Sequence, residues 1–95
     1  LPLPVGTGFP AWLAAVETAL GRLAAAGAEA LVVALGVDTF EGDPISSFRV
    51  ASQDFLRLGR TLRGAGVPTV FTLEGGYAVE ALGRNVANVL DGFEA

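Results

Sequence analysis

The sequence predicts an α/β segment in which helices alternate with two adjacent parallel strands, in the order α-β-α-β-α. Two short apolar runs, residues 30–35 and 69–73, are typical of strands in a parallel sheet that is covered on both faces. Longer segments before, between and after these runs repeat apolar residues at helical spacing. The connection between the two runs is short enough for a right-handed βαβ unit, so we expect the strands to be neighbours.

The first helix is predicted to begin near Pro10 and to end at Gly27. A proline fits the first turn of a helix because the N–H that it lacks has no helical partner there. A glycine just past the last apolar position is a common helix stop. The apolar face of this helix is formed by Trp12, Val16, Leu20 and Leu23.

The second helix is predicted to follow a loop rich in turn-forming residues. Ser52 is the expected N-cap, and Asp54 falls in the first turn, where a negative charge is favourable. Gly64 and Gly66 end the helix, and Pro68 prevents its resumption. Its buried stripe is formed by Phe55, Leu58 and Leu62.

The last helix is predicted to follow a tight turn at Glu74-Gly75-Gly76. Gly83 weakens this helix by about 1 kcal/mol relative to alanine, so we interpret it as a mark of close packing. The apolar face is formed by Val79, Leu82, Val86, Val89 and Phe93.

The composition favours a segment of a larger domain over a compact Ala/Gly-rich domain. Of the 95 residues, 52% are hydrophobic and only 17% are charged, and the mean hydropathy is +0.54. The chain begins at Leu1 and contains no methionine, which favours a fragment or a processed product. A sheet of two strands also leaves bare edges, which invite association with the rest of the same domain or with another copy of the chain.

Charge and cysteine content exclude several classes of function. The net charge is −4, lysine is absent and the six arginines are scattered, so we expect no nucleic-acid binding. No apolar stretch approaches the roughly 20 residues needed to span a bilayer. The N-terminus has no basic signal-peptide region, and we expect a cytoplasmic protein. Because cysteine is absent, any metal must use oxygen ligands or ligands from outside the chain.

Two polar residues follow the two predicted strands, Asp38 after the first and Tyr77 after the second. Ligands bind outside the carboxyl ends of the strands in open parallel sheets. At such a position a carboxylate can ligate a metal, act as a base or cap a turn. A phenol can stabilise an oxyanion, or simply pack its ring. Glu74 is either a base or a residue that caps the following helix.

Weaker patterns suggest three other kinds of site. Asp38, Glu41 and Asp43 place three acids in six residues, which hints at a cation site with few ligands. Gly75 and Gly76 at a helix start could bind an anion, although Glu74 opposes it. The motif at residues 6–8 superficially suggests a phosphate loop, but it lacks a preceding strand and the full glycine spacing.

Three motifs follow one another along the chain. They are Leu1-Pro2-Leu3-Pro4 with Gly6-Thr7-Gly8, then Leu35-Gly36-Val37-Asp38-Thr39-Phe40-Glu41-Gly42-Asp43-Pro44-Ile45-Ser46, then Leu73-Glu74-Gly75-Gly76-Tyr77. Together they resemble the histone deacetylase family, and within it the bacterial acetylpolyamine amidohydrolase branch. The resemblance covers nearly the whole chain and implies that residues 1–95 are a C-terminal segment of that family's catalytic domain, within a larger arginase/deacetylase-like three-layer α/β/α fold.

The resemblance implies a zinc-dependent hydrolase that cleaves acetyl-amide bonds on a small cationic amine or on acetyl-lysine. It implies that Asp38 is a zinc ligand and that Tyr77 hydrogen-bonds the scissile carbonyl and its oxyanion. It places Gly75 and Gly76 along the substrate tunnel and Ile45 near the tunnel rim.

The chain also departs from the family pattern, because it contains no histidine. The family requires an Asp-x-His pair for zinc and a tandem His pair for acid–base catalysis. We therefore expect these 95 residues alone neither to bind zinc tightly nor to deacetylate. The alternative is a non-catalytic α/β interaction module derived from a deacetylase.

Overall fold

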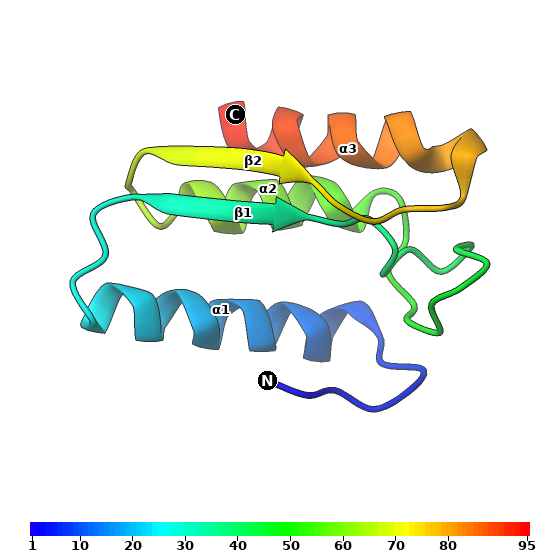
Figure 1. Cartoon of the computed structure of the whole chain (residues 1–95), viewed down its shortest axis with the longest axis horizontal. Helices are drawn as coiled ribbons and strands as arrows, with labels where there is room; N and C mark the ends of the chain where they lie inside the picture. Colours follow the sequence, from blue (N-terminus) through cyan, green and yellow to red (C-terminus); the bar gives the residue numbers. More distant parts are fainter.

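The computed structural model describes all residues, 1–95, and has the predicted order of helices and strands. The two strands form a parallel sheet whose register runs from Leu31 opposite Thr69 to Leu35 opposite Leu73. Figure 1 shows the strands side by side with the three helices around them. The elements are α1 (Phe9–Ala25), β1 (Leu31–Leu35), α2 (Asp54–Arg63), β2 (Thr69–Leu73) and α3 (Val79–Glu94).

The three helices cover one face of the sheet. Helix α2 packs against both α1 and α3 and lies behind the strands in Figure 1. The opposite face is bare, because Val32 and Val70 remain 71% and 60% exposed. Within these residues the strands are therefore covered on one face only, whereas the apolar runs are typical of strands covered on both. The core on the covered face is formed by Phe9, Leu13, Leu35, Val37, Val50, Phe55, Leu58, Leu62 and Val89.

The helix ends agree with the sequence at α1 and differ at α2. Pro10 lies in the first turn of α1, and Gly27 follows the helix with a φ of 83°, which favours glycine. Ser52 is not the N-cap of α2, because Gln53 takes that position and no side chain caps the helix. Instead, the Asp54 carboxylate reaches back and accepts a hydrogen bond from the Ala51 N–H at 2.9 Å.

Two glycines that were not singled out from the sequence, Gly59 and Gly92, allow α2 and α3 to approach closely. A methyl group on Gly59 would overlap the Val89 carbonyl oxygen, and one on Gly92 would overlap the Leu56 carbonyl oxygen. The close packing expected at Gly83 is wrong, because nothing lies within 4 Å of the site of its missing Cβ. Val79 is also not on the buried face of α3, since it is 78% exposed.

These contacts predict opposite effects for alanine at two positions of α3. Gly92→Ala should destabilise the protein by about 1–3 kcal/mol, because the methyl group forces the two helix backbones apart. The matched control Gly83→Ala should stabilise it by up to about 1 kcal/mol, because alanine is the better helix former and the space is open. Urea unfolding of the protein checks both values, and equal stability of the two variants would contradict the packing described.

Candidate functional site

The segments that follow β1 and β2 stay paired beyond the ends of the strands. The Glu74 N–H donates a hydrogen bond to the Leu35 carbonyl at 2.9 Å, and the Val37 N–H donates one to the Gly75 carbonyl at 3.0 Å. This pairing brings residues 36–38 alongside residues 74–76. The two strand-end segments that carry Asp38 and Tyr77 therefore lie at the same edge of the sheet, as the sequence predicts.

The carboxylate of Asp38 lies against the backbone of Gly36 and Gly75. A methyl group on Gly75 would be 2.7 Å from Oδ2 of Asp38, and one on Gly36 would be 2.8 Å from Oδ1. Only glycine leaves room for the carboxylate at these two positions. The side-chain hydrogen bonds of the chain do not include Asp38, so the turn-capping alternative for this residue is wrong.

Gly76 adopts a backbone conformation that other residues rarely take. Its φ is 132°, and a methyl group there would be 2.7 Å from Cγ2 of Val37 and 2.9 Å from Cδ1 of Leu82. Gly75 and Gly76 are half-buried and line a hollow between the end of β2 and α3. A glycine at position 76 is thus required by both the turn and the packing beneath it.

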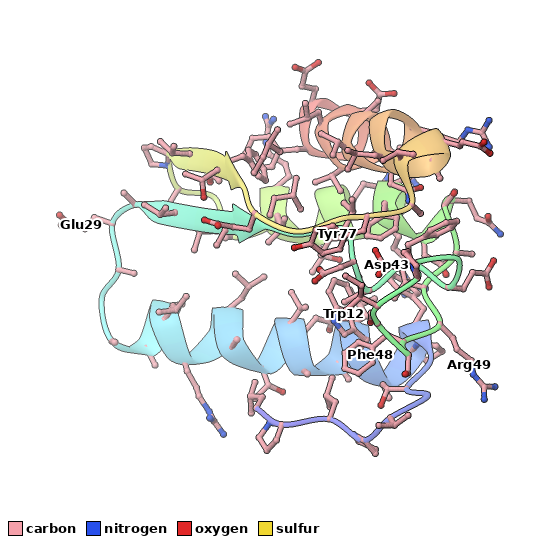
Figure 2. The ribbon with its side chains drawn as sticks, turned by 45° about the vertical axis from the view of Figure 1, so that its right-hand side comes forward. Trp12, Glu29, Asp43, Phe48, Arg49 and Tyr77 are labelled. Carbon is pink, nitrogen blue, oxygen red and sulfur yellow. The ribbon has the colours of Figure 1, made fainter.

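Asp43 is a residue of the site whose role could not be predicted from the sequence. Its side chain is only 7% exposed, and its two oxygens hold two separate segments. Oδ1 accepts hydrogen bonds from the N–H groups of Ile45 and Ser46, at 2.8 Å and 3.1 Å. Oδ2 accepts one from the N–H of Tyr77 at 2.9 Å, and Figure 2 shows Asp43 and Tyr77 close together.

These hydrogen bonds keep the Asp43 carboxyl ionised. Burial raises the pKa of this carboxyl, but the hydrogen bonds from the backbone N–H groups of Tyr77, Ile45 and Ser46 together outweigh it. The pKa therefore lies below its ordinary value of 3.8. The charged form of Asp43 is the one that holds the two segments together at neutral pH.

The side chains of Tyr77 and Ile45 both face the outside of the molecule. They are 52% and 72% exposed. Tyr77 lines an open hollow together with Phe40 and Pro44, separate from the hollow that Gly75 and Gly76 line. The structure thus joins Ile45 to Tyr77 through Asp43, and Asp38 to Gly75 by direct contact, but these 95 residues do not close one pocket around all five predicted site residues.

The acidic cation site suggested by the sequence is wrong. The Asp43 oxygens are engaged by backbone N–H groups, and no three His, Cys, Asp or Glu side chains lie close enough to hold a metal ion. Asp38 has a carboxylate without hydrogen bonds to the protein, which suits an oxygen donor to a metal. One carboxylate is fewer than the roughly three protein ligands of a catalytic zinc site.

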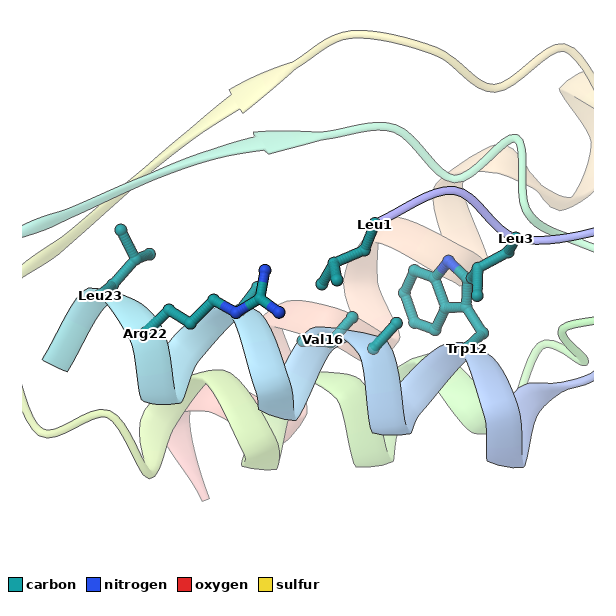
Figure 3. A pocket seen from close by; sticks show the side chains of 8 residues that line it. Leu1, Leu3, Trp12, Val16, Arg22 and Leu23 are labelled. Carbon is teal, nitrogen blue, oxygen red and sulfur yellow. The ribbon is translucent and has the colours of Figure 1, made fainter. Parts of the chain in front are cut away.

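Another hollow of the molecule lies away from the strand ends. It is about 530 Å³ and is bounded by the first residues of the chain and the outer side of α1. Figure 3 shows Leu1 and Leu3 over Trp12 and Val16, with Arg22 as the charged group in the lining. Without a carboxylate, a phenol or a hydroxyl, this hollow offers no group for hydrolysis.

The motif at residues 6–8 supports the loop that carries Asp43. The Gly6 N–H donates to the Ser47 carbonyl at 3.1 Å, and the Arg49 N–H donates to the Thr7 carbonyl at 2.9 Å. Gly6 and Thr7 therefore serve backbone pairing, which leaves the phosphate-loop alternative without support. None of the three helices combines the length and the apolar character that a membrane span requires.

Comparison with known proteins identifies the family. Residues 1–93 match the model of the histone deacetylase domain. The chain belongs to the histone deacetylase family. Over 93 residues it is 52% identical to acetylpolyamine amidohydrolase 1 of Pseudomonas aeruginosa, covering 98% of the chain and 27% of the relative. Over 91 residues it is 53% identical to the acetylpolyamine amidohydrolase of Mycoplana ramosa, covering 96% of the chain and 27% of the relative.

The fold also agrees with a solved deacetylase. The chain superposes on the acetylpolyamine aminohydrolase of Burkholderia pseudomallei with a TM-score of 0.95 and 38% identity, covering 100% of the chain and 28% of that protein. This confirms the predicted family, its acetylpolyamine amidohydrolase branch and the deacetylase fold. The chain spans about 27% of the length of the curated relatives that it matches.

Proposed function

We propose that the full-length protein containing these residues is a zinc-dependent amidohydrolase that releases acetate from acetylated amines. In this proposal Asp38 is a zinc ligand and Tyr77 donates a hydrogen bond to the oxyanion. The observation that carries it is the carboxylate of Asp38, which lies at the carboxyl end of the sheet without a hydrogen bond, in a space left by Gly36 and Gly75. A carboxylate kept free in this way is available to a metal.

The chemistry follows from these two side chains. A bound zinc would polarise the scissile carbonyl and lower the pKa of its water toward about 7. Asp38 supplies one oxygen ligand, and the remaining ligands come from parts of the full-length protein outside these residues, since the chain has no histidine or cysteine. The phenol of Tyr77, which is exposed, donates its proton in a hydrogen bond to the carbonyl oxygen as negative charge develops there.

The substrate that we propose is a small cationic acetylated amine, such as an acetylated polyamine. The relatives named above are acetylpolyamine amidohydrolases, and the net charge of −4 suits a cation. Gly75 and Gly76 lie where a slender acyl chain can approach the backbone. Ile45, exposed on the loop held by Asp43, forms part of the rim.

Metal-stripped full-length protein tests this proposal. We expect it to hydrolyse an N-acetylated diamine only after zinc is restored, and to act on it with a higher kcat/KM than on an acetyl-lysine peptide. Release of acetate is the measurement, and zinc content is determined on the same sample. Activity that is unaffected by metal removal would contradict the zinc role.

The non-catalytic interaction module remains the second candidate, because one face of the sheet is bare and apolar. Val32 and Val70, which lie on this face, are 71% and 60% exposed. If the protein is an amidohydrolase, we expect the rest of the catalytic domain to cover this face. Zinc-loaded full-length protein that releases no acetate from any acetylated amine would favour the module.

A further inference from the structure

We propose that Asp43 is a positioning residue for catalysis, which aims the phenol of Tyr77 by holding the Tyr77 backbone N–H. This inference rests on the proposed function, because it gives Asp43 a role only if Tyr77 acts on the substrate. In this inference one buried carboxylate couples two loops. One loop carries Ile45 at the rim, and the other carries Tyr77.

The geometry divides the carboxylate between the two loops. Oδ1 closes the local turn by accepting hydrogen bonds from the N–H groups of Ile45 and Ser46, at 2.8 Å and 3.1 Å. Oδ2 is not used in this turn. It accepts a hydrogen bond at 2.9 Å from the N–H of Tyr77, which is 34 residues away in the sequence. A turn alone needs only the first oxygen. The second oxygen therefore serves the position of Tyr77.

The backbone around Tyr77 has few other restraints. Gly75 and Gly76 precede it, and Gly76 takes a conformation that is open mainly to glycine. The helix that follows begins at Val79, and its N-cap, Ala78, has no side-chain cap. The side chain of Tyr77 is itself 52% exposed, so packing does not fix it firmly. The hydrogen bond to Asp43 is thus the specific anchor of this segment to the loop opposite.

Asp43→Asn in the full-length protein removes this anchor with little change in shape. An amide has one acceptor oxygen, which cannot serve both loops at once. We expect kcat to fall about 10–100-fold, as for other residues that orient a group at a site, while KM and zinc content stay unchanged. The loss should stay below that of Tyr77→Phe, because a misaimed phenol still acts in part.

Two further variants separate positioning from folding. Asp43→Ser retains a short acceptor for the local turn but cannot reach Tyr77, and we expect the same loss of kcat. Asp54→Asn is the matched control. Asp54 also accepts a hydrogen bond from a backbone N–H, that of Ala51, but this bond lies within the start of its own helix. We expect its kcat to equal that of the unmodified protein.

A double variant gives the decisive readout. If Asp43 acts through the phenol, Asp43→Asn should lower kcat less than twofold when Tyr77 is already phenylalanine, since there is no hydroxyl left to aim. An equal loss in both backgrounds would overturn the inference, as would loss of zinc or of the fold in both Asp43 variants. If Tyr77→Phe itself retains full activity, the proposed function is wrong; if only Asp43→Asn retains it, the inference alone is wrong.

Discussion

Tyr77→Phe in the full-length protein is expected to lower kcat for acetyl-amine hydrolysis about 10²–10³-fold, with zinc retained. The substitution removes only the hydroxyl, so the ring and the backbone hydrogen bond to Asp43 stay in place. The lost hydrogen bond is one that strengthens as the oxyanion develops, which is why the effect falls on kcat rather than on KM. Steady-state kinetics and zinc content of the same preparation are the measurements.

A nearby hydroxyl provides the control for this variant. The Thr39 hydroxyl is buried without a hydrogen-bond partner and is next to Asp38 in the sequence. Thr39→Val removes it with little change in shape, which should be neutral or slightly stabilising. We expect kcat to stay within twofold of the unmodified protein. A Tyr77→Phe enzyme that is as active as Thr39→Val would show that Tyr77 has no role in the chemistry.

Asp38→Ala is the second change with a large expected effect, and it should act on the metal. Removing one of about three protein ligands should abolish zinc occupancy and with it measurable hydrolysis. The fold should persist, because the Asp38 carboxylate makes no hydrogen bond within these residues. It only lies beside the backbone of Gly36 and Gly75, so its removal breaks no contact on which the fold depends. Elemental analysis of the metal, together with thermal unfolding, checks both expectations.

Glu41→Ala is the control for Asp38→Ala, since Glu41 is an exposed acid in the same loop. It should keep both zinc and activity, because its carboxylate has no part in the proposed site. If Asp38→Ala retains stoichiometric zinc, or if Glu41→Ala loses it, the assignment of the metal ligand is wrong.

Local sequence patterns were enough to predict the helices and strands. Each of these elements is marked by its own residues, by an apolar period or by a glycine or proline at its end. Asp38 and Tyr77 were found by a rule of topology, because the carboxyl ends of parallel strands meet at one edge of a sheet. The placement of their two segments at one edge of the sheet is confirmed by the hydrogen bonds that continue the sheet past Leu35 and Leu73.

Two features could not be predicted because they depend on contacts between distant residues. The sequence pattern singled out Asp43 as one acid of a possible cation site, but its second oxygen accepts a hydrogen bond from the N–H of Tyr77, 34 residues further along the chain. Gly59 and Gly92 look like weak points of their helices until α2 and α3 are placed together. The same reasoning misled the interpretation of Gly83, whose surroundings are open. Local propensity ranks such glycines alike, and only packing distinguishes them.

The most direct test of the proposed site is the position of the metal in crystals of the full-length protein. Anomalous diffraction measured on both sides of the zinc absorption edge locates zinc independently of any assumption about its ligands. We predict a peak about 2.0–2.2 Å from a carboxylate oxygen of Asp38, with the phenol of Tyr77 facing the open coordination position. A zinc peak remote from Asp38, or a Tyr77 side chain turned away from the metal when substrate is bound, would contradict the proposal.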